Sequence, residues 1–311
     1  MELNLKGSIP ANILPFTKDL AIDEPNYRRH LDWLASQKGV GGITCNGHAG
    51  EVSTLTREER RRVVAIAAET VADRIPLIAG IYAENAPQAI DFAKDAQAEG
   101  ADVLLVFPLN ALLFGGTPEM ALCHFAALAD AVPLPLVLFM YPQWTHMQYA
   151  EDTLLTICSK VPSVVAVKEW SLDIRVYERN LRAIRSLDHH VSMLTSFSTN
   201  LLPSLELGAD GILSGHGSVI ADLQADLLDA VWRHDAPAAH TLYERIQKLT
   251  KVIYKDPMVD MYTRMKEQLV MLGRQDQAVV RPPLLPLTDE ERAQLRQALD
   301  ATELLSPAGV G

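Results

Sequence analysis

The sequence predicts a (β/α)₈ barrel, also called a TIM barrel, with a helical extension at its C-terminal end. Eight short apolar runs rich in β-branched residues alternate with eight amphipathic segments, and Gly or Pro bounds most of them. Strands buried on both faces of a parallel sheet have this continuous apolar character. After residue 235 the strand-like runs stop and only helical patterns remain. We therefore expect residues 1–235 to form the barrel and residues 236–311 to form a helical extension packed on it.

The elements of the predicted barrel alternate regularly along the chain. The predicted strands are Gly7–Pro15, Gly41–Asn46, Pro76–Tyr82, Asp102–Pro108, Pro135–Tyr141, Val164–Trp170, Val191–Phe197 and Gly211–Ser214. The predicted helices of the barrel are Pro25–Lys38, Thr56–Arg74, Ala86–Gly100, Thr117–Ala131, Ala150–Val161, Asp173–Leu187, Asn200–Leu207 and Ala221–His234. The second of these begins Thr-Arg-Glu-Glu, which is a capping box and marks a helix start. The extension is predicted to hold helices at Pro237–Asp256, Met258–Gly273 and Thr288–Leu305.

Composition and charge argue against several classes of protein. The 311 residues are 48% apolar and carry 28 Lys and Arg against 39 Asp and Glu. The resulting net charge of −11 argues against nucleic acid or an anionic membrane as a partner. The longest apolar stretch, residues 103–114, is interrupted by Pro108 and Asn110 and is too short to span a bilayer. The N-terminal residues lack the basic and apolar run of a signal peptide, so we expect a cytoplasmic protein.

Neither a nucleotide-binding loop nor a metal site is indicated. An open, doubly wound sheet is the alternative to the barrel, but it normally has a Gly-rich loop after its first strand. This chain has Pro-Phe-Thr at residues 15–17 instead. Cys45, Cys123 and Cys158 are scattered without a CxxC pair, and no cluster of His, Asp and Glu has the spacing of metal ligands. We therefore expect reduced thiols and no bound metal.

Lys168 carries the clearest chemical signal in the sequence. It follows Val164–Val167, a run that belongs to the barrel wall, and reactive groups of such barrels lie at the carboxyl ends of the strands. Burial can lower the pKa of a lysine from about 10.4 toward about 7–8, which makes the amine a nucleophile that forms an imine with a ketone. The other role that fits this position is an ion pair with Glu169 or another carboxylate at the rim.

The fifth strand supplies a second candidate beside this lysine. Phe139 and Tyr141 share one face of the strand, because side chains along a strand alternate between its two faces. If that face is turned to the lumen, the Tyr141 hydroxyl could carry protons to and from a substrate on Lys168. Tyr141 as a wall residue with a satisfied hydroxyl fits the sequence equally well.

The second strand ends in a turn of small residues that surrounds a histidine. Gly47, His48, Ala49 and Gly50 form this turn, whose backbone N–H groups could hold a carboxylate. His48 could move a proton near neutral pH, or it could hydrogen-bond to the backbone of the rim. The remaining candidate contacts to a substrate lie on the fifth strand, in the loop after it, and at the end of the eighth strand. They are Phe139, Trp144, Leu213 and His216.

Seven sequence motifs together resemble one enzyme family over nearly the whole chain. They are Pro15-Phe16-Thr17, Gly47-x-x-Gly50-Glu51, Leu55-Thr56-x-Glu58-Glu59, Arg74–Gly80, Gly100–Asp102, Val165–Glu169 and Leu207–Gly211. With them the chain resembles the dihydrodipicolinate synthase / N-acetylneuraminate lyase family of class I, pyruvate-type aldolases. The resemblance implies that Lys168 forms the imine, so that no separate cofactor is needed, and that the turn before Glu51 binds the carboxylate of the keto acid.

Departures from the family pattern bear on the second substrate. Members usually have two hydroxyl residues where this chain has His48 and Ala49, and the synthase has Tyr-Asn-Val-Pro where this chain has Phe-Met-Tyr-Pro at residues 139–142. The arginine that grips the second carboxylate in the synthase falls at Trp144. A tyrosine pair that relays protons across a subunit contact in relatives is replaced by Leu109 and Asn110. We therefore expect a second substrate that is more apolar than that of the synthase.

Three functions fit this combination of residues. The first is an aldolase that makes or breaks a carbon–carbon bond to pyruvate or another 2-oxo acid. The second is a dehydratase or deaminase that uses the same imine on a 2-keto-3-deoxy acid or a cyclic imino acid. The third is a barrel that binds a keto acid without turnover. The apolar segment 109–114 lies where relatives form a subunit contact, so we also expect a homodimer or homotetramer.

Overall fold

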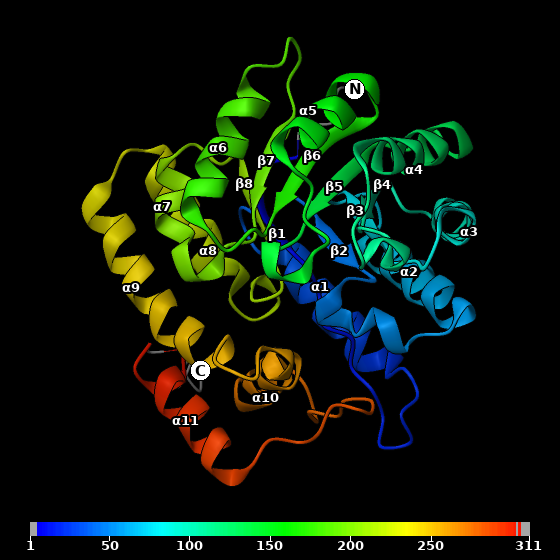
Figure 1. Ribbon diagram of the computed structural model, residues 1–311. Coiled ribbons are helices and arrows are strands. Elements are labelled where there is room, and N and C mark those ends of the chain that lie inside the picture. The colour runs from blue at the N-terminus through cyan, green and yellow to red at the C-terminus, as the bar shows by residue number, and fades with distance from the viewer. Residues whose placement is uncertain (1–4, 303, 306–311) are drawn as a thin grey trace.

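Eight parallel strands close into a barrel that is surrounded by helices (Figure 1). The computed structural model describes residues 5–302, 304 and 305. The strands are β1 (Gly7–Pro10), β2 (Ile43–Cys45), β3 (Leu77–Ile81), β4 (Val103–Val106), β5 (Leu136–Met140), β6 (Val164–Glu169), β7 (Ser192–Thr195) and β8 (Gly211–Ser214). They pair in the order β1-β8-β7-β6-β5-β4-β3-β2, and single bridges from Ser8 to Val40 and from Ala11 to Thr44 bring the first two strands together. The predicted barrel is confirmed.

Helices alternate with the strands and then continue into the C-terminal extension. Those of the barrel are α1 (Glu24–Ser36), α2 (Arg57–Val71), α3 (Ala86–Ala98), α4 (Pro118–Ala131), α5 (Glu151–Lys160), α6 (Ile174–Arg185), α7 (Leu201–Glu206) and α8 (Gly217–Trp232). The extension contains α9 (Ala236–Ile253), α10 (Met261–Met271) and α11 (Asp289–Asp300). Short 3₁₀ turns follow several strands, among them η1 (His48–Gly50), which forms part of the site, and η4 (Gln143–Thr145). No helix in the described part of the chain is both long and apolar enough to cross a bilayer.

Side chains of the sequence set where many of these helices begin. Thr56 accepts a hydrogen bond from the Glu59 N–H while the Glu59 carboxylate accepts one from the Thr56 N–H, so the predicted capping box of α2 is confirmed. Thr288 and Glu291 form a second capping box at α11. Such caps satisfy backbone donors that the first turn of a helix leaves without partners.

Some element boundaries differ from the sequence-based expectation. The apolar run predicts a first strand that reaches Pro15, but β1 ends at Pro10, after which only the bridge at Ala11 continues the pairing. The helix expected from Met258 begins as a 3₁₀ turn, and regular α10 starts at Met261. The eighth helix starts at Gly217 and has a kink at Ile220. An apolar pattern marks burial, but these ends depend on local backbone geometry that the pattern does not contain.

Two layers of apolar side chains lie on either side of the strands. The inner layer fills the lumen and includes Ile9, Leu105, Phe107, Val137 and Phe139, while the outer layer packs the strands against the helices. Because side chains alternate along a strand, lumen-facing Ala166 places Lys168 of β6 in the lumen as well.

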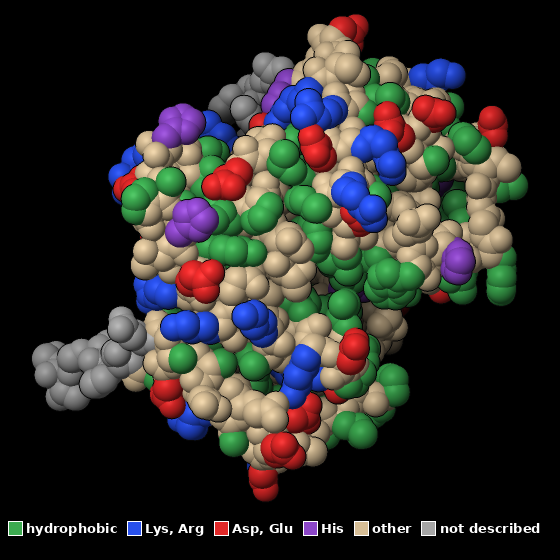
Figure 2. All heavy atoms as spheres, turned by 60° about the vertical axis from the view of Figure 1, so that its left-hand side comes forward, with side chains coloured by type: hydrophobic (Ala, Val, Ile, Leu, Met, Phe, Trp, Pro, Cys, Tyr) green, Lys and Arg blue, Asp and Glu red, His purple; other side chains and the backbone are tan. Residues whose placement is uncertain are grey.

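The extension packs along one side of the barrel and over its mouth. Helix α9 lies against α8 and α11, and α10 lies close to the turn η1 (Figure 1). On the face shown in Figure 2, acidic and basic side chains are interspersed, and no broad area of one sign dominates it. The carboxyl ends of the strands therefore meet both their own loops and the C-terminal helices.

Candidate active site

Lys168 lies at the carboxyl end of β6 with its amine enclosed in the mouth of the barrel. The residue is 6% exposed, and its Nζ lies 4.0 Å from the centroid of the Phe139 ring, over the ring face. Burial lowers the pKa of Lys168 to about 7, because a charged amine loses its hydration there. At neutral pH a large fraction of the amine is therefore uncharged and able to act as a nucleophile.

The neighbouring carboxylate does not pair with this amine. Glu169 points to the other side of β6, where its carboxyl accepts hydrogen bonds from the Ser171 N–H at 3.2 Å and from Asn180 Nδ2 at 3.3 Å. Burial raises the pKa of Glu169 to about 7. In the described part of the chain no carboxylate lies within ion-pair distance of Lys168 Nζ. The geometry therefore argues against the ion-pair role that the sequence left open for this lysine.

The turn after β2 presents backbone N–H groups close to the same cavity. In η1 the Gly50 N–H donates to the Gly47 carbonyl at 3.1 Å, whereas the N–H groups of His48 and Ala49 have no backbone acceptor among the described residues. The preceding bend brings the Asn46 carbonyl to 2.1 Å from the position that a Cβ on residue 80 would occupy, so only Gly80 fits there. A pair of free N–H groups of this kind can hold a carboxylate.

His48 and Tyr141 form a direct hydrogen bond across the mouth. His48 Nε2 lies 2.5 Å from the Tyr141 hydroxyl. Loss of water around the ring and the nearby Lys168 lower the pKa of His48 to about 3, and burial raises the pKa of Tyr141 well above its usual value. Both groups are therefore uncharged near neutral pH. The resting imidazole of His48 is therefore a neutral hydrogen-bond partner of the Tyr141 hydroxyl, and the proton-transfer role of His48 stays a prediction.

Aromatic rings form most of the wall around these polar groups. The Phe139 and Tyr141 ring centroids are 4.8 Å apart, and those of His48 and Phe107 are 5.0 Å apart. Trp170 joins the cluster, with its ring 6.0 Å from Phe139. Edge-to-face packing of this kind holds the side chains in fixed orientations.

The cavity above Lys168 is narrow, with a free volume of about 40 Å³. The residues that line it come from the ends of six of the barrel's strands, or the turns after them, and from the extension. They are Ala11, His48, Ala49, Phe139, Lys168, Trp170, Ser196, Gly215, Tyr254, Met261, Tyr262 and Met265. Lys168 is the only cationic side chain among these lining residues, because His48 is neutral.

Several predicted contact residues lie elsewhere. Trp144 of η4 is 64% exposed and does not line the cavity. His216 is fully buried behind Gly215, with its ring 6.2 Å from that of Tyr254. Leu213 belongs to the lumen core below the cavity, and Gly47 and Gly50 frame the turn without lining the free space.

The sequence does not predict the lining residues that the extension supplies. Tyr254, Met261, Tyr262 and Met265 line the cavity, but no sequence signal states where a C-terminal helix packs on a barrel. Ser196 and Gly215 could have been selected, because they directly follow strands β7 and β8.

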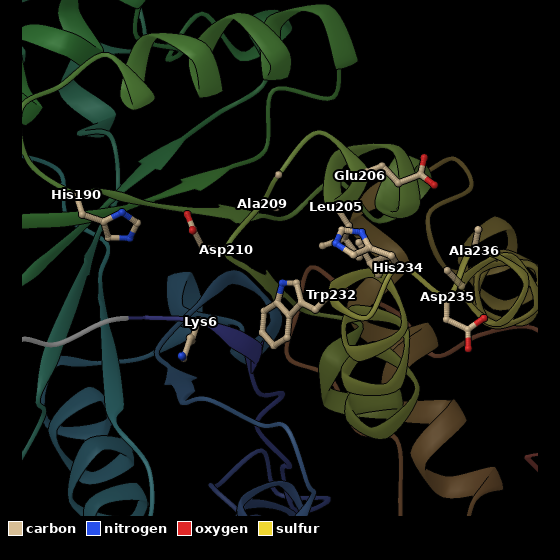
Figure 3. A pocket seen from close by; sticks show the side chains of 13 residues that line it. Lys6, His190, Leu205, Glu206, Ala209, Asp210, Trp232, His234, Asp235 and Ala236 are labelled. Carbon is tan, nitrogen blue, oxygen red and sulfur yellow. The ribbon is translucent and has the colours of Figure 1, made fainter.

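A wider hollow lies at the opposite end of the barrel (Figure 3). It has a volume of about 720 Å³ and lies beside the amino ends of β1, β7 and β8, where Lys6, His190 and Asp210 precede the strands. Asp210 accepts hydrogen bonds from Arg185 and from the Met193 N–H, so its carboxylate is already engaged in the fold. This end of such a barrel contributes to stability, whereas chemistry is located at the carboxyl ends of the strands.

Comparison with known proteins identifies one family. A family model described as the dihydrodipicolinate synthetase family matches residues 4–302. A 4-hydroxy-tetrahydrodipicolinate synthase of Maridesulfovibrio salexigens is 29% identical over 303 residues, which cover 97% of this chain and 100% of that protein. A protein of the same name from Neisseria meningitidis serogroup C is 30% identical over 300 residues, which cover 96% and 99%.

Solved structures of the same family superpose closely on this chain. The dihydrodipicolinate synthase of Aquifex aeolicus matches with a TM-score of 0.87 and 26% identity, over 96% of this chain and 98% of that one. YagE, a prophage protein from Escherichia coli K12 solved in complex with pyruvate, matches with a TM-score of 0.89 and 26% identity, over 97% and 100%. The overall backbone fold is therefore shared with these proteins.

Proposed function

The chain belongs to the dihydrodipicolinate synthetase family, a group of lyases and aldolases, and from this membership we propose that it is a class I lyase in which Lys168 forms an imine with a 2-oxo acid. The keto acid that we propose is pyruvate or an acid that releases pyruvate. YagE was solved in complex with pyruvate, which supports this choice.

The observation that carries the proposal is the enclosed amine of Lys168. It lies at the bottom of a cavity, its pKa is lowered to about 7, and no carboxylate of the described residues pairs with it. A lysine that served only the fold would be expected to have an anionic partner, because an isolated buried charge is costly.

The first step joins the amine to the ketone carbon. The lone pair of Lys168 Nζ attacks C2 of the keto acid to give a carbinolamine. The carbinolamine takes up one proton from the surrounding water and loses its hydroxyl group as a water molecule, which leaves a protonated imine. The free N–H groups of His48 and Ala49 hold the carboxylate beside this carbon. The imine then serves as an acceptor for the electron pair of a bond to C3.

Tyr141 and His48 transfer the proton of the second substrate. As the C3–C4 bond breaks, its electrons enter the imine to give an enamine, and the C4 hydroxyl loses its proton to form an aldehyde. Tyr141 takes this proton while it passes its own to His48 Nε2, which lies 2.5 Å away. The same path returns a proton to C3 of the enamine, and hydrolysis of the imine releases pyruvate and the free amine.

The walls of the cavity favour an uncharged, apolar second substrate. Phe139, Trp170, Tyr254 and Tyr262 line the space above the amine, and no arginine lies among the lining residues to pair with a second carboxylate. A carboxylate placed there would lose its hydration without a bidentate partner. We therefore propose an aldehyde with an apolar or aromatic side chain as the partner of pyruvate.

Borohydride trapping with pyruvate tests the proposed function. Reduction of the imine makes the adduct permanent, and peptide mass mapping locates it. We expect a pyruvate adduct on the peptide that contains Lys168, and no adduct in Lys168→Ala. An adduct with longer 2-keto acids but not with pyruvate would favour the dehydratase or deaminase. The absence of any adduct would refute the enzyme and leave the barrel that binds without turnover.

A further inference from the structure

A buried ion pair ties the extension to the turn after β2. Lys266 Nζ of α10 lies 2.5 Å from Glu51 Oε1, and the two side chains are 0% and 1% exposed. The same Nζ donates to the Val279 carbonyl at 2.7 Å. Glu51 directly follows η1, and its φ of 53° lies in the left-handed region. The pair therefore fixes the end of the turn that presents the free N–H groups.

Arg281 of the extension holds the same loop at further points. Its backbone N–H donates to Glu51 Oε2 at 3.0 Å, and its guanidinium donates to the Thr54 carbonyl at 3.0 Å. Two more hydrogen bonds, of 2.9 and 2.6 Å, join the guanidinium to the Glu59 carboxylate. Arg281 also donates to the Leu20 carbonyl in the loop after β1 at 2.6 Å. One side chain thus connects the first two strand-end loops to the extension.

The ring of Phe16 lies beside both of these cations. Lys266 Nζ lies 4.2 Å and Arg281 Cζ 4.4 Å from its centroid. Contacts of cations with an aromatic face are attractive, and more so where water is excluded. In Figure 1 the segment between α10 and α11, drawn in orange, runs toward the blue loop that follows β1, as these contacts require.

Helix α10 forms a wall of the active-site cavity as well. Met261, Tyr262 and Met265 line the space above Lys168, and Met265 directly precedes Lys266. Lys266, which forms the ion pair with Glu51, and the residues of α10 that line the cavity therefore lie within two turns of one helix. A shift of α10 would move both parts of the site together.

Stability alone is a poor reason to keep two buried charges here. Removing such a pair from water carries a large desolvation cost for each ion, and an apolar pair of similar size is often as stable. Burial lowers the pKa of Lys266 to about 8, while the charge of Glu51 opposes that shift. An ion pair fixes the orientation of its two side chains, because its hydrogen bonds define where each charged group lies. An apolar contact does not fix an orientation in this way.

We propose that Lys266 and Arg281 are positioning residues that act through Glu51 to hold η1 in the conformation that binds the carboxylate of the keto acid. The inference rests on the proposed function of this site. Neither cation lines the cavity, so neither touches the substrate. Loss of the ion pair loosens the turn and weakens carboxylate binding, but it leaves the amine of Lys168 on β6 reactive.

Trapping with two ketones tests this role. Pyruvate has a carboxylate and acetone does not, and both can form an imine with Lys168. For Lys266→Met, and for the double variant Glu51→Gln, Lys266→Met, we expect the half-saturating concentration of pyruvate to rise about tenfold. The limiting trapping rate and the reaction with acetone should stay within about threefold of the unaltered protein.

A matched control removes a charge from an exposed ion pair. Arg182 of α6 pairs with Glu178 at 2.6 Å, and its side chain is 75% exposed. Exposed pairs contribute little to stability, so Arg182→Met should leave trapping with both ketones unchanged. Circular dichroism of each variant checks that it is folded. The double variant Glu51→Gln, Lys266→Met leaves no unpaired buried charge. If Lys266→Met alone does not fold, trapping with pyruvate and acetone is therefore measured on the double variant.

Each other outcome counts against the inference in its own way. An unchanged half-saturating concentration of pyruvate would overturn it, and an equal loss with acetone would indicate general loosening of the cavity. Failure of the double variant to fold would make the pair a structural requirement instead of a positioning device. If the unaltered protein forms an adduct with neither ketone, the result refutes the proposed function, and the positioning role that rests on it is refuted as well.

Discussion

The amine of Lys168 is surrounded by apolar and aromatic side chains, and this environment sets the pH at which it can react. With a pKa of about 7, about half of the amine is neutral at pH 7, and the neutral fraction falls about tenfold per pH unit at lower pH. We expect the initial rate of adduct formation with pyruvate, measured with cyanoborohydride, to rise with pH and to level off above about pH 8. A rate that keeps rising toward about pH 10, as for an exposed lysine, would contradict the lowered pKa.

The hydrogen bond between His48 and Tyr141 leads to a second expectation at the scale of residues. Removal of a group that transfers protons typically costs about 10²–10⁴-fold in rate. Tyr141→Phe should lower the rate at which pyruvate exchanges its C3 protons with deuterated water by about this factor, whereas trapping of pyruvate on Lys168 continues. His48→Gln should act in the same direction, because an amide oxygen can accept a hydrogen bond from the Tyr141 hydroxyl but cannot take up its proton.

The double variant separates a relay from two independent groups. If Tyr141 and His48 act as one unit, Tyr141→Phe combined with His48→Gln should be no slower than the slower single variant. Proton exchange followed by nuclear magnetic resonance measures all three. Losses that multiply in the double variant would show that the two groups act separately, and an unaltered exchange rate in Tyr141→Phe would remove Tyr141 from the mechanism.

Single residues of the site could be predicted where strand geometry fixes them. The positions of Lys168, Phe139 and His48 follow from the rule that loops at the carboxyl ends of barrel strands carry the chemistry. Trp144 follows β5 too, but η4 turns its side chain to solvent, and no periodicity in the sequence describes a 3₁₀ turn. The low pKa of His48 also needed the structure, because it depends on rings from several strands.

At the scale of elements, β6 places one ionisable side chain on each of its faces. Lys168 enters the lumen, and Glu169 is buried between β6 and α6 with a pKa raised to about 7. As pH rises from about 4.5, the unfolded chain releases the Glu169 proton first, while the folded chain keeps it until about pH 7. Glu169 therefore lowers the free energy of unfolding across this interval, by up to roughly 3 kcal/mol above pH 7.

Glu169→Gln removes this pH-dependent loss. The amide oxygen can still accept the hydrogen bond from the Ser171 N–H, and no carboxylate remains to ionise. We expect the variant to gain stability relative to the unaltered protein as pH rises from about 5 to about 8, as measured by urea unfolding at each pH. Glu206→Gln, a change at an exposed position, provides the control. The same pH dependence in Glu169→Gln and in the unaltered protein would contradict the raised pKa.

The elements themselves could be predicted more completely than their packing. Continuous apolar runs gave all eight strands, and the Thr-x-x-Glu pattern gave the start of α2. The presence of helices after residue 235 could be predicted, but the face of α10 that covers the cavity could not. Amphipathic spacing shows that one face is buried, and it does not state which surface buries it.

For the whole molecule, association of copies stays a prediction. The segment after β4 exposes Leu113, Phe114 and Met120, and Phe114 is 97% exposed. Large apolar side chains that are exposed together often mark a surface that another chain covers. The expected homodimer or homotetramer would give this segment a partner.

The extension and the barrel share one continuous apolar cluster, so we expect them to form one cooperative unit. Ile246 and Leu249 of α9 and Leu269 of α10 are fully buried in the same apolar cluster as the outer side of the barrel. Glu51, which belongs to the barrel, is buried with its cationic partner on α10. A chain that ends at Asp235 would expose the apolar face of α8 and leave a buried carboxylate without its cation.

We therefore expect the full chain to unfold in a single transition and the chain that ends at Asp235 to lack fixed tertiary structure. Thermal unfolding followed by near- and far-ultraviolet circular dichroism should give coincident curves for the full chain. The shortened chain should lose its near-ultraviolet signal and bind a hydrophobic dye, because its apolar surfaces stay open. A cooperative transition in the shortened chain would instead mean that the barrel folds alone. The extension would then be needed for the active site but not for folding of the barrel. Its main contribution would be the contacts of α10 with the turn after β2.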